Sequence, residues 1–496
     1  MTSLDPLHQG LTDAWALHQG ASTVEHVVVV LPSYTLFGAA REHYASRISG
    51  LEHRHLLSLL EMSHSPSCHI IFVSCEEPAP EVLRYVLSLM PETAGDVLSR
   101  FEVLVVPGPR NQSLAANLLE RPDLLDELRE RLRGRPAMLD PWIVTRDEAA
   151  VARALGVPVN GPLPALRHLG TKGGGRRLFR QLGVPVPAGR EEIRQPGDVV
   201  AAIRALRHEQ RALRAVVVKL DDSTSGDGNR VLELGDPLAL HSRWSDVRRV
   251  TEALPPWFRQ DLRRGGVVEE LVEGATVTSP SVQLDITPCG EVRVLSTHEQ
   301  VLGGPDLQLY DGCRFPAIPA YSAALAEHGG TVGRALAERG AVGRLSVDFM
   351  ARQDRDGAWQ LYAIEINLRK SGTTYPFSAL QHLVPGCYDP GEGRYVTADG
   401  SCRAYSSSDT LLDQGWVGLS PTEVVGALRD SGVAFDPATG SGALAHTLSG
   451  LRGEGRLGLT AIGLTPDHAA ALYGDAVTAL RRLARPAAAA ASPAGP

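Results

Sequence analysis

Two segments, Arg344-Leu-Ser-Val-Asp348-Phe-Met350 and Leu361-Tyr-Ala-Ile-Glu365-Ile-Asn367, decide the fold of the region that carries the chemistry. Both have the apolar pattern of strands. Glu365 and Asn367 are two residues apart and share one face, while the isoleucines beside them point into the core. Asp348 reaches the same face from the paired strand. Two carboxylates and an amide suit Mg²⁺, and the flanking apolar residues disfavour the alternative that both carboxylates lie in solvent.

Lysine is rare in this chain, because only three of the 49 basic residues are lysines: Lys172, Lys219 and Lys370. A lysine supplies a compact point charge where arginine supplies a planar fork. Lys172 precedes a glycine run, and Lys219 ends an apolar strand before the loop 221–229. Such a lysine can neutralise ATP phosphates, and the backbone N–H groups of the loop can bind them. The two aspartates after Lys219 are then expected to point away from the phosphates. The alternatives are that the loop is a plain hairpin turn and that the three lysines have been retained by chance.

Composition limits the class of protein. A chain of 496 residues is expected to form two to four domains. The formal net charge of −8 argues against a protein whose main partner is a nucleic acid. The N-terminus lacks the basic start and apolar stretch of a signal peptide, and no apolar run reaches membrane-spanning length. We therefore expect a cytoplasmic protein with neither a nucleic-acid nor a membrane partner.

Cysteine and histidine spacing gives no metal site. The six cysteines never form a CxxC pair, so reduced and mostly buried thiols are expected. The segment His298-Glu-Gln-Val-Leu302 begins like a zincin helix but has leucine where the second histidine belongs. The sixteen histidines form no cluster that spacing alone supports.

The first third of the chain alternates apolar runs, at 27–31, 70–73 and 103–106, with helical stretches such as 51–62, 81–90 and 114–132. This pattern predicts a parallel sheet covered on both faces. Residues 1–165 are therefore expected to form a Rossmann-like α/β domain. The first strand is not followed by G-x-G-x-x-G, so dinucleotide binding is not expected there.

The remaining chain divides by composition into four further parts. Turn-forming residues at 156–164 mark the first boundary. A small lobe with the phosphate-binding loop is expected over 166–268. A larger lobe of antiparallel strands, with the magnesium site, follows over 269–385. Residues 386–485 form a C-terminal domain, and the Ala/Pro-rich stretch 486–496 is expected to be disordered.

The order of these signals resembles the ATP-grasp superfamily: a phosphate lysine, a second lysine with a loop of small residues, a hinge glutamate, an aspartate and a Glu-x-Asn. The resemblance is closer to the pheganomycin-type peptide ligases, a carboxylate–amine ligase family, and spans about residues 165–465. The segments that carry it are 219–229, 299–302, 312–316, 365–374 and 458–463. It implies a mixed α/β and α+β fold: a Rossmann-like pre-ATP-grasp domain, a two-lobed ATP-grasp fold and a family-specific C-terminal segment.

The resemblance also assigns roles to residues. Those implied at ATP are Lys172, Lys219, Ser225, Gly226, Gly228, Asn229, Glu269, Glu270, Leu271, Val272 and Glu273. Those implied to hold two Mg²⁺ are Asp348, Glu365 and Asn367. Catalytic roles fall to Lys219, Arg293 and Arg369, and substrate contacts fall to Arg369, Ser371, Gly372, Thr373 and Thr374. Two departures from the family pattern are Thr276, where a ribose carboxylate is usual, and Ser346, where many members have arginine.

The implied reaction is ATP-dependent peptide ligation. The carboxylate of an amino acid, modified or non-proteinogenic, is activated as an acyl phosphate and joined to the N-terminal amine of a peptide, as in specialised-metabolite biosynthesis. The Gly-rich stretch 301–316 would act as a lid, and dimerisation is a further expectation. The alternatives are a ligase that joins another carboxylic acid to a small amine, and a non-catalytic nucleotide-binding regulator.

Overall fold

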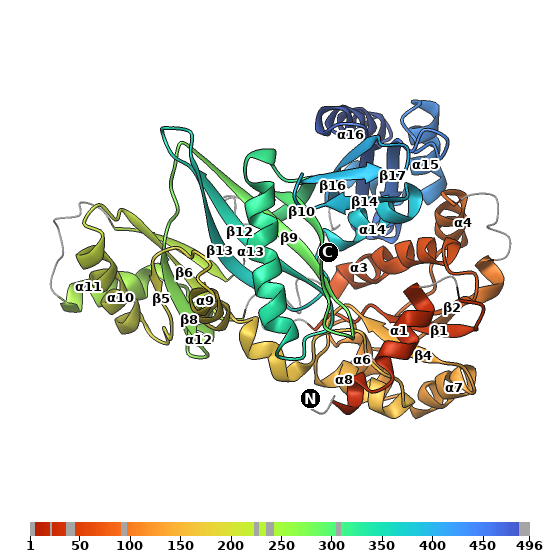
Figure 1. Ribbon diagram of the computed structural model, residues 1–496, viewed down its shortest axis with the longest axis horizontal. Helices are drawn as coiled ribbons and strands as arrows, with labels where there is room; N and C mark the ends of the chain where they lie inside the picture. Colours follow the sequence, from red (N-terminus) through yellow and green to blue (C-terminus); the bar gives the residue numbers. More distant parts are fainter. Residues whose placement is uncertain are drawn as a thin grey trace, which may run out of the picture. The chain divides into compact units, whose positions relative to one another are not determined.

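The computed structural model describes residues 5–19, 22–35, 45–90, 97–222, 228–234, 243–303 and 309–485 (Figure 1). The chain divides into two compact units. Unit 1 contains residues 1–160, 372–387 and 394–496, and unit 2 contains residues 161–371 and 388–393. Within the described ranges no helix has the length and apolar character needed to cross a membrane.

The N-terminal part of unit 1 is built on a four-stranded parallel sheet in the order β3-β2-β1-β4. The strands are β1 (His26–Leu31), β2 (Cys68–Ser74), β3 (Phe101–Val105) and β4 (Ala137–Pro141). Every residue of β1 is buried, as expected for a central strand with helices on both faces. The predicted Rossmann-like α/β fold is confirmed. Its helices are α1 (Leu11–Gln19), α3 (Ile48–His53), α4 (Pro80–Ser88), α6 (Leu114–Leu119), α7 (Pro122–Leu132) and α8 (Arg146–Leu155).

Two of the predicted helices are broken. The helix expected over 51–62 is α3 followed by a 3-10 helix, Arg54–Ser63. The helix expected over 114–132 is α6 and α7, which meet at Pro122. Proline has no backbone N–H and fits the first turn of a helix, so it ends one helix and starts the next.

The C-terminal segment packs with the N-terminal α/β part in unit 1. Its antiparallel strands are β15 (Arg394–Thr397), β16 (Cys402–Leu412), β17 (Gly442–His446) and β18 (Arg456–Gly463), and its helices are α14 (Thr374–Leu383), α15 (Pro421–Asp430) and α16 (Pro466–Arg481). Strand β14 (Gly386–Asp389) crosses the boundary between the units. Tyr85 of α4 accepts a hydrogen bond from the backbone N–H of Ala445 at 2.9 Å, and Arg54 pairs with Asp409. The predicted domain boundaries themselves stay predictions.

The smaller sheet of unit 2 is antiparallel, in the order β5-β8-β6-β7. Its strands are β5 (Gly189–Arg190), β6 (Ala215–Leu220), β7 (Asn229–Glu233) and β8 (Gly266–Glu270). Helices α10 (Pro196–Glu209), α11 (Arg243–Ala253) and α12 (Pro256–Leu262) contribute to a core with alternate residues of β6. Val216, Val218 and Leu220 face this core, so Val217 and Lys219 face the other way.

The larger sheet of unit 2 has antiparallel strands in the order β13-β12-β9-β10-β11. They are β9 (Thr276–Ile286), β10 (Val292–Gly303), β11 (Leu309–Phe315), β12 (Gly343–Gln353) and β13 (Trp359–Asn367). Helix α13 (Pro319–Ala337) lies across one face (Figure 1), where Val282, Leu284, Leu345 and Val347 are buried. The polar residues that alternate with these side chains therefore occupy the opposite face.

Most of the stretch 301–316, for which a lid role is predicted, consists of paired strands, and the lid role itself stays a prediction. The end of β10 and the whole of β11 occupy most of it as paired strands, and residues 304–308 lie outside the described ranges. Alternating apolar and polar residues in this stretch allow strand pairing, which its glycines do not prevent.

Helix α9 (Lys172–Gln181) begins with the glycine run and places Lys172 at its first turn. The side chain of Thr171 caps the helix by accepting from the N–H of Gly174 at 3.0 Å. A Cβ at position 174 would come within 1.8 Å of the carbonyl oxygen of His168. Glycine is therefore required here by the close approach of two backbone segments.

Gly174→Ala is expected to lower the melting temperature, because the new methyl group meets backbone that cannot move aside; overpacking of this kind costs about 1–3 kcal/mol. The control is Gly197→Ala in the first turn of α10, where a Cβ meets nothing within 4 Å. The control should be neutral or stabilising by up to about 1 kcal/mol. Equal melting temperatures for the two variants in thermal unfolding would contradict this account of α9.

Candidate functional site

Asp348 and Glu365 face each other from β12 and β13 because β13 contains a bulge. Asp348 pairs with Glu365, but the next residue of β12, Phe349, pairs with Ala363, so Ile364 is the extra residue. Without the bulge, Glu365 would share the buried face of Ala363. The expectation that Ile364 points into the core is wrong, since the core contains Ile366 and not Ile364.

Asn367 and the two carboxylates form a compact set of oxygen donors. Asn367 donates from Nδ2 to Asp348 Oδ2 at 2.8 Å. Burial of the carboxyl, together with the negative charge of Glu365, raises the pKa of Asp348 to about 7, against the lowering effects of Arg369, Lys172 and Asn367. A like-charge pair of this kind is stabilised by a cation. The donor set therefore fits the Mg²⁺ that the resemblance implies.

Lys172 lies beside this pair. Its ammonium forms an ion pair with the carboxylate of Glu365, and the side chain is 8% exposed. The backbone N–H of Lys172 donates to the carbonyl of Asp221 at 3.2 Å, and the side chain of Asp221 accepts from the N–H of Gly173 at 2.7 Å. Asp221 thus anchors the start of α9, while the exposed Asp222 pairs with Arg167.

Lys219 is held by a buried ion-pair network. Its Nζ lies 2.5 Å from Glu269 Oε2, and the other oxygen of Glu269 lies 2.5 Å from Arg176 Nη1. Burial raises the pKa of Glu269, but Lys219 and Arg176 outweigh it and keep the pKa below its usual value. Arg176 also pairs with Glu191 at 2.9 Å and donates to the carbonyl of Pro187 at 2.9 Å. The side chain of Glu269 therefore positions Lys219.

Residues 270–272, at the end of β8, already make several hydrogen bonds to other parts of the protein. The N–H of Glu270 donates to Ala188 and the N–H of Leu271 donates to Ala215, at 2.8 and 3.2 Å. Glu270 Oε1 accepts from the N–H of Ala188 at 2.8 Å. The ATP contact predicted for residues 270–272 would therefore use their carbonyl oxygens or Val272.

The remaining residues predicted to contact ATP are exposed, lie outside the described ranges, or are known only from their backbone contacts. Glu273 and Thr276 are both exposed. Ser225 and Gly226 lie outside the described residues. Gly228 accepts through its carbonyl from the N–H of Leu220 at 2.9 Å, and Asn229 is the register partner of Lys219.

Arg293 lies on the same face of the sheet as Asp348 but far from it along the strands. It forms two hydrogen bonds with Glu291, at 3.1 and 2.9 Å, and its register partner on β9 is Asp285. Asp348 pairs with Ser281, four residues further along β9. That offset corresponds to about 13 Å along the strand, so the catalytic role predicted for Arg293 has no support in the geometry.

Arg369 and Ser371 lie in unit 2 with the metal face. Arg369 is close enough for its charge to lower the pKa of Asp348. Ser371 accepts from Gln283 Nε2 at 2.7 Å. The other residues predicted to contact substrate, Gly372, Thr373 and Thr374, belong to unit 1.

The sequence prediction missed a row of neutral polar side chains beside the metal face. Across the sheet, Asn367 pairs with Ser346, Ser346 with Gln283, and Gln283 with Ser296. In the next row Asp348 pairs with Ser281. The buried hydroxyls of Ser281, Ser296 and Ser346 have no hydrogen-bond partner within the part of the chain that the structure describes. The alternation of small polar and apolar residues over 279–285 was the available signal.

Comparison with known proteins decides the family. Family models match for a pre ATP-grasp domain over residues 71–157, for an IQCH-like ATP-grasp domain over 256–389 and for the PGM1 C-terminal domain over 423–474. The L-propargylglycine–L-glutamate ligase of Streptantibioticus cattleyicolor is 31% identical over 426 residues, which cover 84% of this chain and 86% of the relative. The chain belongs to the ATP-grasp carboxylate–amine ligases.

Solved structures support the fold of this ATP-grasp ligase. An ADP complex of N5-carboxyaminoimidazole ribonucleotide synthetase superposes with a TM-score of 0.54 at 11% identity, covering 93% of this chain and 98% of that one. A biotin carboxylase from Campylobacter jejuni superposes with a TM-score of 0.55 at 11% identity, covering 93% and 95%. The three-part fold predicted from the sequence is confirmed.

Glu269→Gln is expected to destabilise the ligase and to weaken ATP binding. Removing one charge leaves Lys219 and Arg176 without their shared buried partner, which costs about 3–5 kcal/mol. The melting temperature and the KM for ATP measure the two effects.

The matched control is Glu191→Gln. Glu191 also binds Arg176, and its other ion pair among the described residues is with Arg180 rather than Lys219. This variant should lose stability while keeping the KM for ATP near that of the unchanged chain. The positioning role of Glu269 is wrong if both variants raise that KM equally.

Proposed function

We propose that the ligase uses ATP to activate the carboxylate of an amino acid and to join it to the amine of a second amino acid or a peptide. The observation that carries the proposal is the metal face, on which Asp348 and Glu365 are register partners, Asn367 donates to Asp348, and Lys172 is paired to Glu365. The name of the Streptantibioticus relative supports two amino acids as substrates. A modified donor and a peptide acceptor, as in specialised metabolism, remain the finer form of the proposal.

The nucleotide would be held by both lysines. Lys172 and Lys219 each have a carboxylate partner, so each ammonium is already ordered before ATP arrives. Binding of two Mg²⁺ by Asp348, Glu365 and Asn367 would supply positive charge that stabilises the phosphoryl group in transfer. Lys172 would then be released from Glu365 to contact a phosphate.

In the first step, an oxygen of the substrate carboxylate attacks the γ-phosphorus of ATP. The bond from that phosphorus to the bridging oxygen breaks, and its electron pair leaves with ADP. Lys219 and Lys172 stabilise the charge that develops on the phosphates. The product of this step is an acyl phosphate.

In the second step, the acceptor nitrogen attacks the acyl carbon and loses a proton. The bond from that carbon to the phosphate oxygen breaks, and inorganic phosphate leaves with the electron pair. We assign Arg369 to stabilise the oxyanion, because its positive charge already acts on the neighbouring Asp348. We assign Ser346 and Gln283 of the polar row, together with Ser281 in the next row, to bind the amino acid, since their hydroxyls and amide can bind ammonium and carboxylate groups.

The test is release of ADP from ATP and Mg²⁺ across amino-acid donors, each with amino-acid and short-peptide acceptors, with mass spectrometry of the products. The proposal predicts ADP together with a new mass equal to both substrates minus water. Comparing single amino acids with peptides as acceptors distinguishes the two forms of the proposal, in which the acceptor is an amino acid or a peptide. An acid without an amino group and a small amine are also included, and a product formed from them would support the alternative ligase.

Glu365→Gln should reduce turnover by about 10²–10³-fold, the loss typical of removing one group that stabilises developing charge. The control is Glu233→Gln, at an exposed position on β7, which should turn over normally. Normal turnover by Glu365→Gln would exclude the metal assignment. ATP binding without ADP release for any pair of donor and acceptor would favour the non-catalytic nucleotide-binding regulator.

A further inference from the structure

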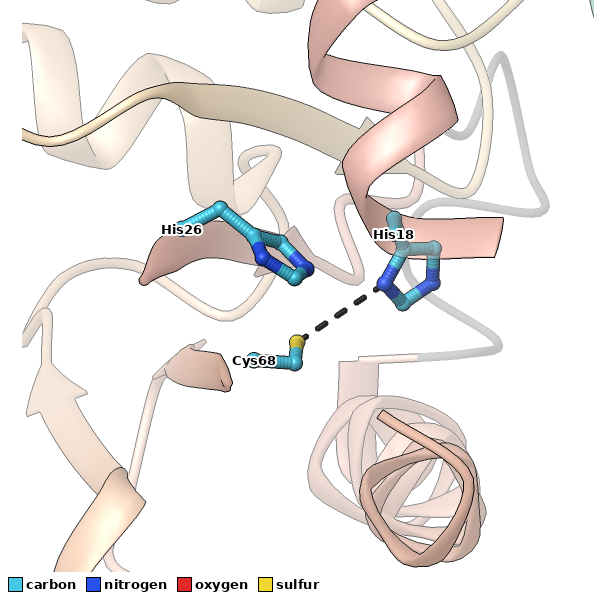
Figure 2. A group of neighbouring side chains, drawn as sticks. All are labelled: His18, His26 and Cys68. Atoms are coloured by element: carbon cyan, nitrogen blue, oxygen red, sulfur yellow. Dashed lines mark hydrogen bonds between the residues drawn. The ribbon is translucent and has the colours of Figure 1, made fainter. Parts of the chain in front are cut away.

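Three metal-ligating side chains meet in unit 1, in a cluster that contains none of the proposed active-site residues. His18 lies near the end of α1, His26 begins β1 and Cys68 begins β2. His26 and Cys68 are register partners on adjacent parallel strands. One ligand atom from each residue lies within 4.8 Å of the other two (Figure 2). Nothing in the ATP-dependent reaction uses these side chains.

His26 has the proton arrangement of a metal ligand. Its Nδ1 lies 3.1 Å from the carbonyl oxygen of Val24. A carbonyl only accepts, so Nδ1 carries the proton and Nε2 has a free lone pair. The side chain is 2% exposed, and Nε2 has no hydrogen-bond partner among the residues that the structure describes. A buried lone pair without a donor is costly unless something binds it.

His18 presents one nitrogen to the sulfur and the other to a carboxylate. Its Nδ1 lies 3.7 Å from Cys68 Sγ, and its Nε2 lies 3.3 Å from Glu61 Oε2. A ligating histidine commonly donates its second nitrogen to a carboxylate, which fixes the ring and raises its basicity. Glu61 therefore occupies the position of an outer-shell partner.

Cys68 is suited to bind an ion and unsuited to attack a substrate. The ligand form of cysteine is the thiolate. Cys68 is 0% exposed, which denies access to a substrate, whereas the His18 side chain is 11% exposed and leaves a small ion a path.

We propose that His18, His26 and Cys68 bind one zinc-class divalent ion. One thiolate and two imidazoles suit Zn²⁺ and exclude Mg²⁺, which prefers oxygen. Tetrahedral bonds of about 2.3 Å to sulfur and 2.05 Å to nitrogen separate those two ligand atoms by about 3.6 Å. The 3.7 Å between Cys68 Sγ and His18 Nδ1 matches this separation. A water molecule would complete the coordination shell.

The bound ion would tie α1 to the sheet. Because His18, His26 and Cys68 come from three separate segments, no short spacing in the sequence reveals them, and the expectation that the histidines form no metal cluster missed this arrangement. An ion that binds the folded state alone raises its stability. The site therefore has a structural role that is separate from catalysis.

The test uses the full chain without a histidine tag, stripped of metal by a chelator and then titrated with Co²⁺. We expect one equivalent to produce a thiolate-to-cobalt charge-transfer band in the near ultraviolet, which Zn²⁺ then displaces. Cobalt in the oxygen-donor site of Asp348 and Glu365 produces no such band, so the result does not depend on the proposed ligase activity. One equivalent of Zn²⁺ should also raise the melting temperature.

Cys68→Ser and His26→Ala should lose the band and the zinc-dependent shift, while Cys402→Ser, a half-buried cysteine of the same unit, should keep both. Circular dichroism establishes that each protein is folded. If the variants fail to fold, the cobalt titration and the zinc-dependent melting shift of the unchanged chain test the proposal on their own. A folded, metal-stripped chain that shows neither band nor shift overturns the proposal, as does a band that persists in Cys68→Ser.

Discussion

The pairing of Asp348 with Glu365 on adjacent strands is the constraint around which the candidate site of unit 2 is arranged. Two acidic groups on paired strands repel each other, and burial raises the pKa of Asp348 to about 7. The bulge at Ile364 creates this pairing by turning Glu365 away from the apolar core. A hydrogen bond from Asn367 and an ion pair from Lys172 offset part of the repulsion. The remaining charge is the reason that this face suits a magnesium-bound phosphate.

The same unit keeps its positive charges in place with buried partners. Glu269 is shared by Lys219 and Arg176, and Arg176 is in turn held by Glu191. Such pairs do not add much to stability overall, but breaking one leaves an uncompensated buried charge. Their value here is a fixed geometry: under the proposed function, Lys219 would need no reorganisation when ATP binds. Glycine at position 174 fixes the start of α9 in a different way, by letting its backbone approach the carbonyl of His168 closely.

Much of this was predictable from residue patterns. Apolar runs gave the parallel strands of unit 1, and the Asp348 strand with the Glu-x-Asn strand gave the metal face. Local patterns could not show the bulge, because Ile364 and Ile366 look alike in sequence and only strand pairing separates them. Nor could they show the pair of Arg176 with Glu269, whose partners are 93 residues apart. Arg293 looked suitable by residue type, yet the register of β9 and β10 places it elsewhere.

The most direct measurement of the central claim follows oxygen from the acid. A donor amino acid labelled with ¹⁸O in its carboxylate is incubated with the ligase, ATP, Mg²⁺ and an acceptor amine, and the inorganic phosphate is analysed by mass spectrometry. Activation as an acyl phosphate predicts that one labelled oxygen from each donor appears in the phosphate, because the bond from carbon to that oxygen breaks when the amine attacks. Phosphate without the label, formed together with the amide product, would contradict the account.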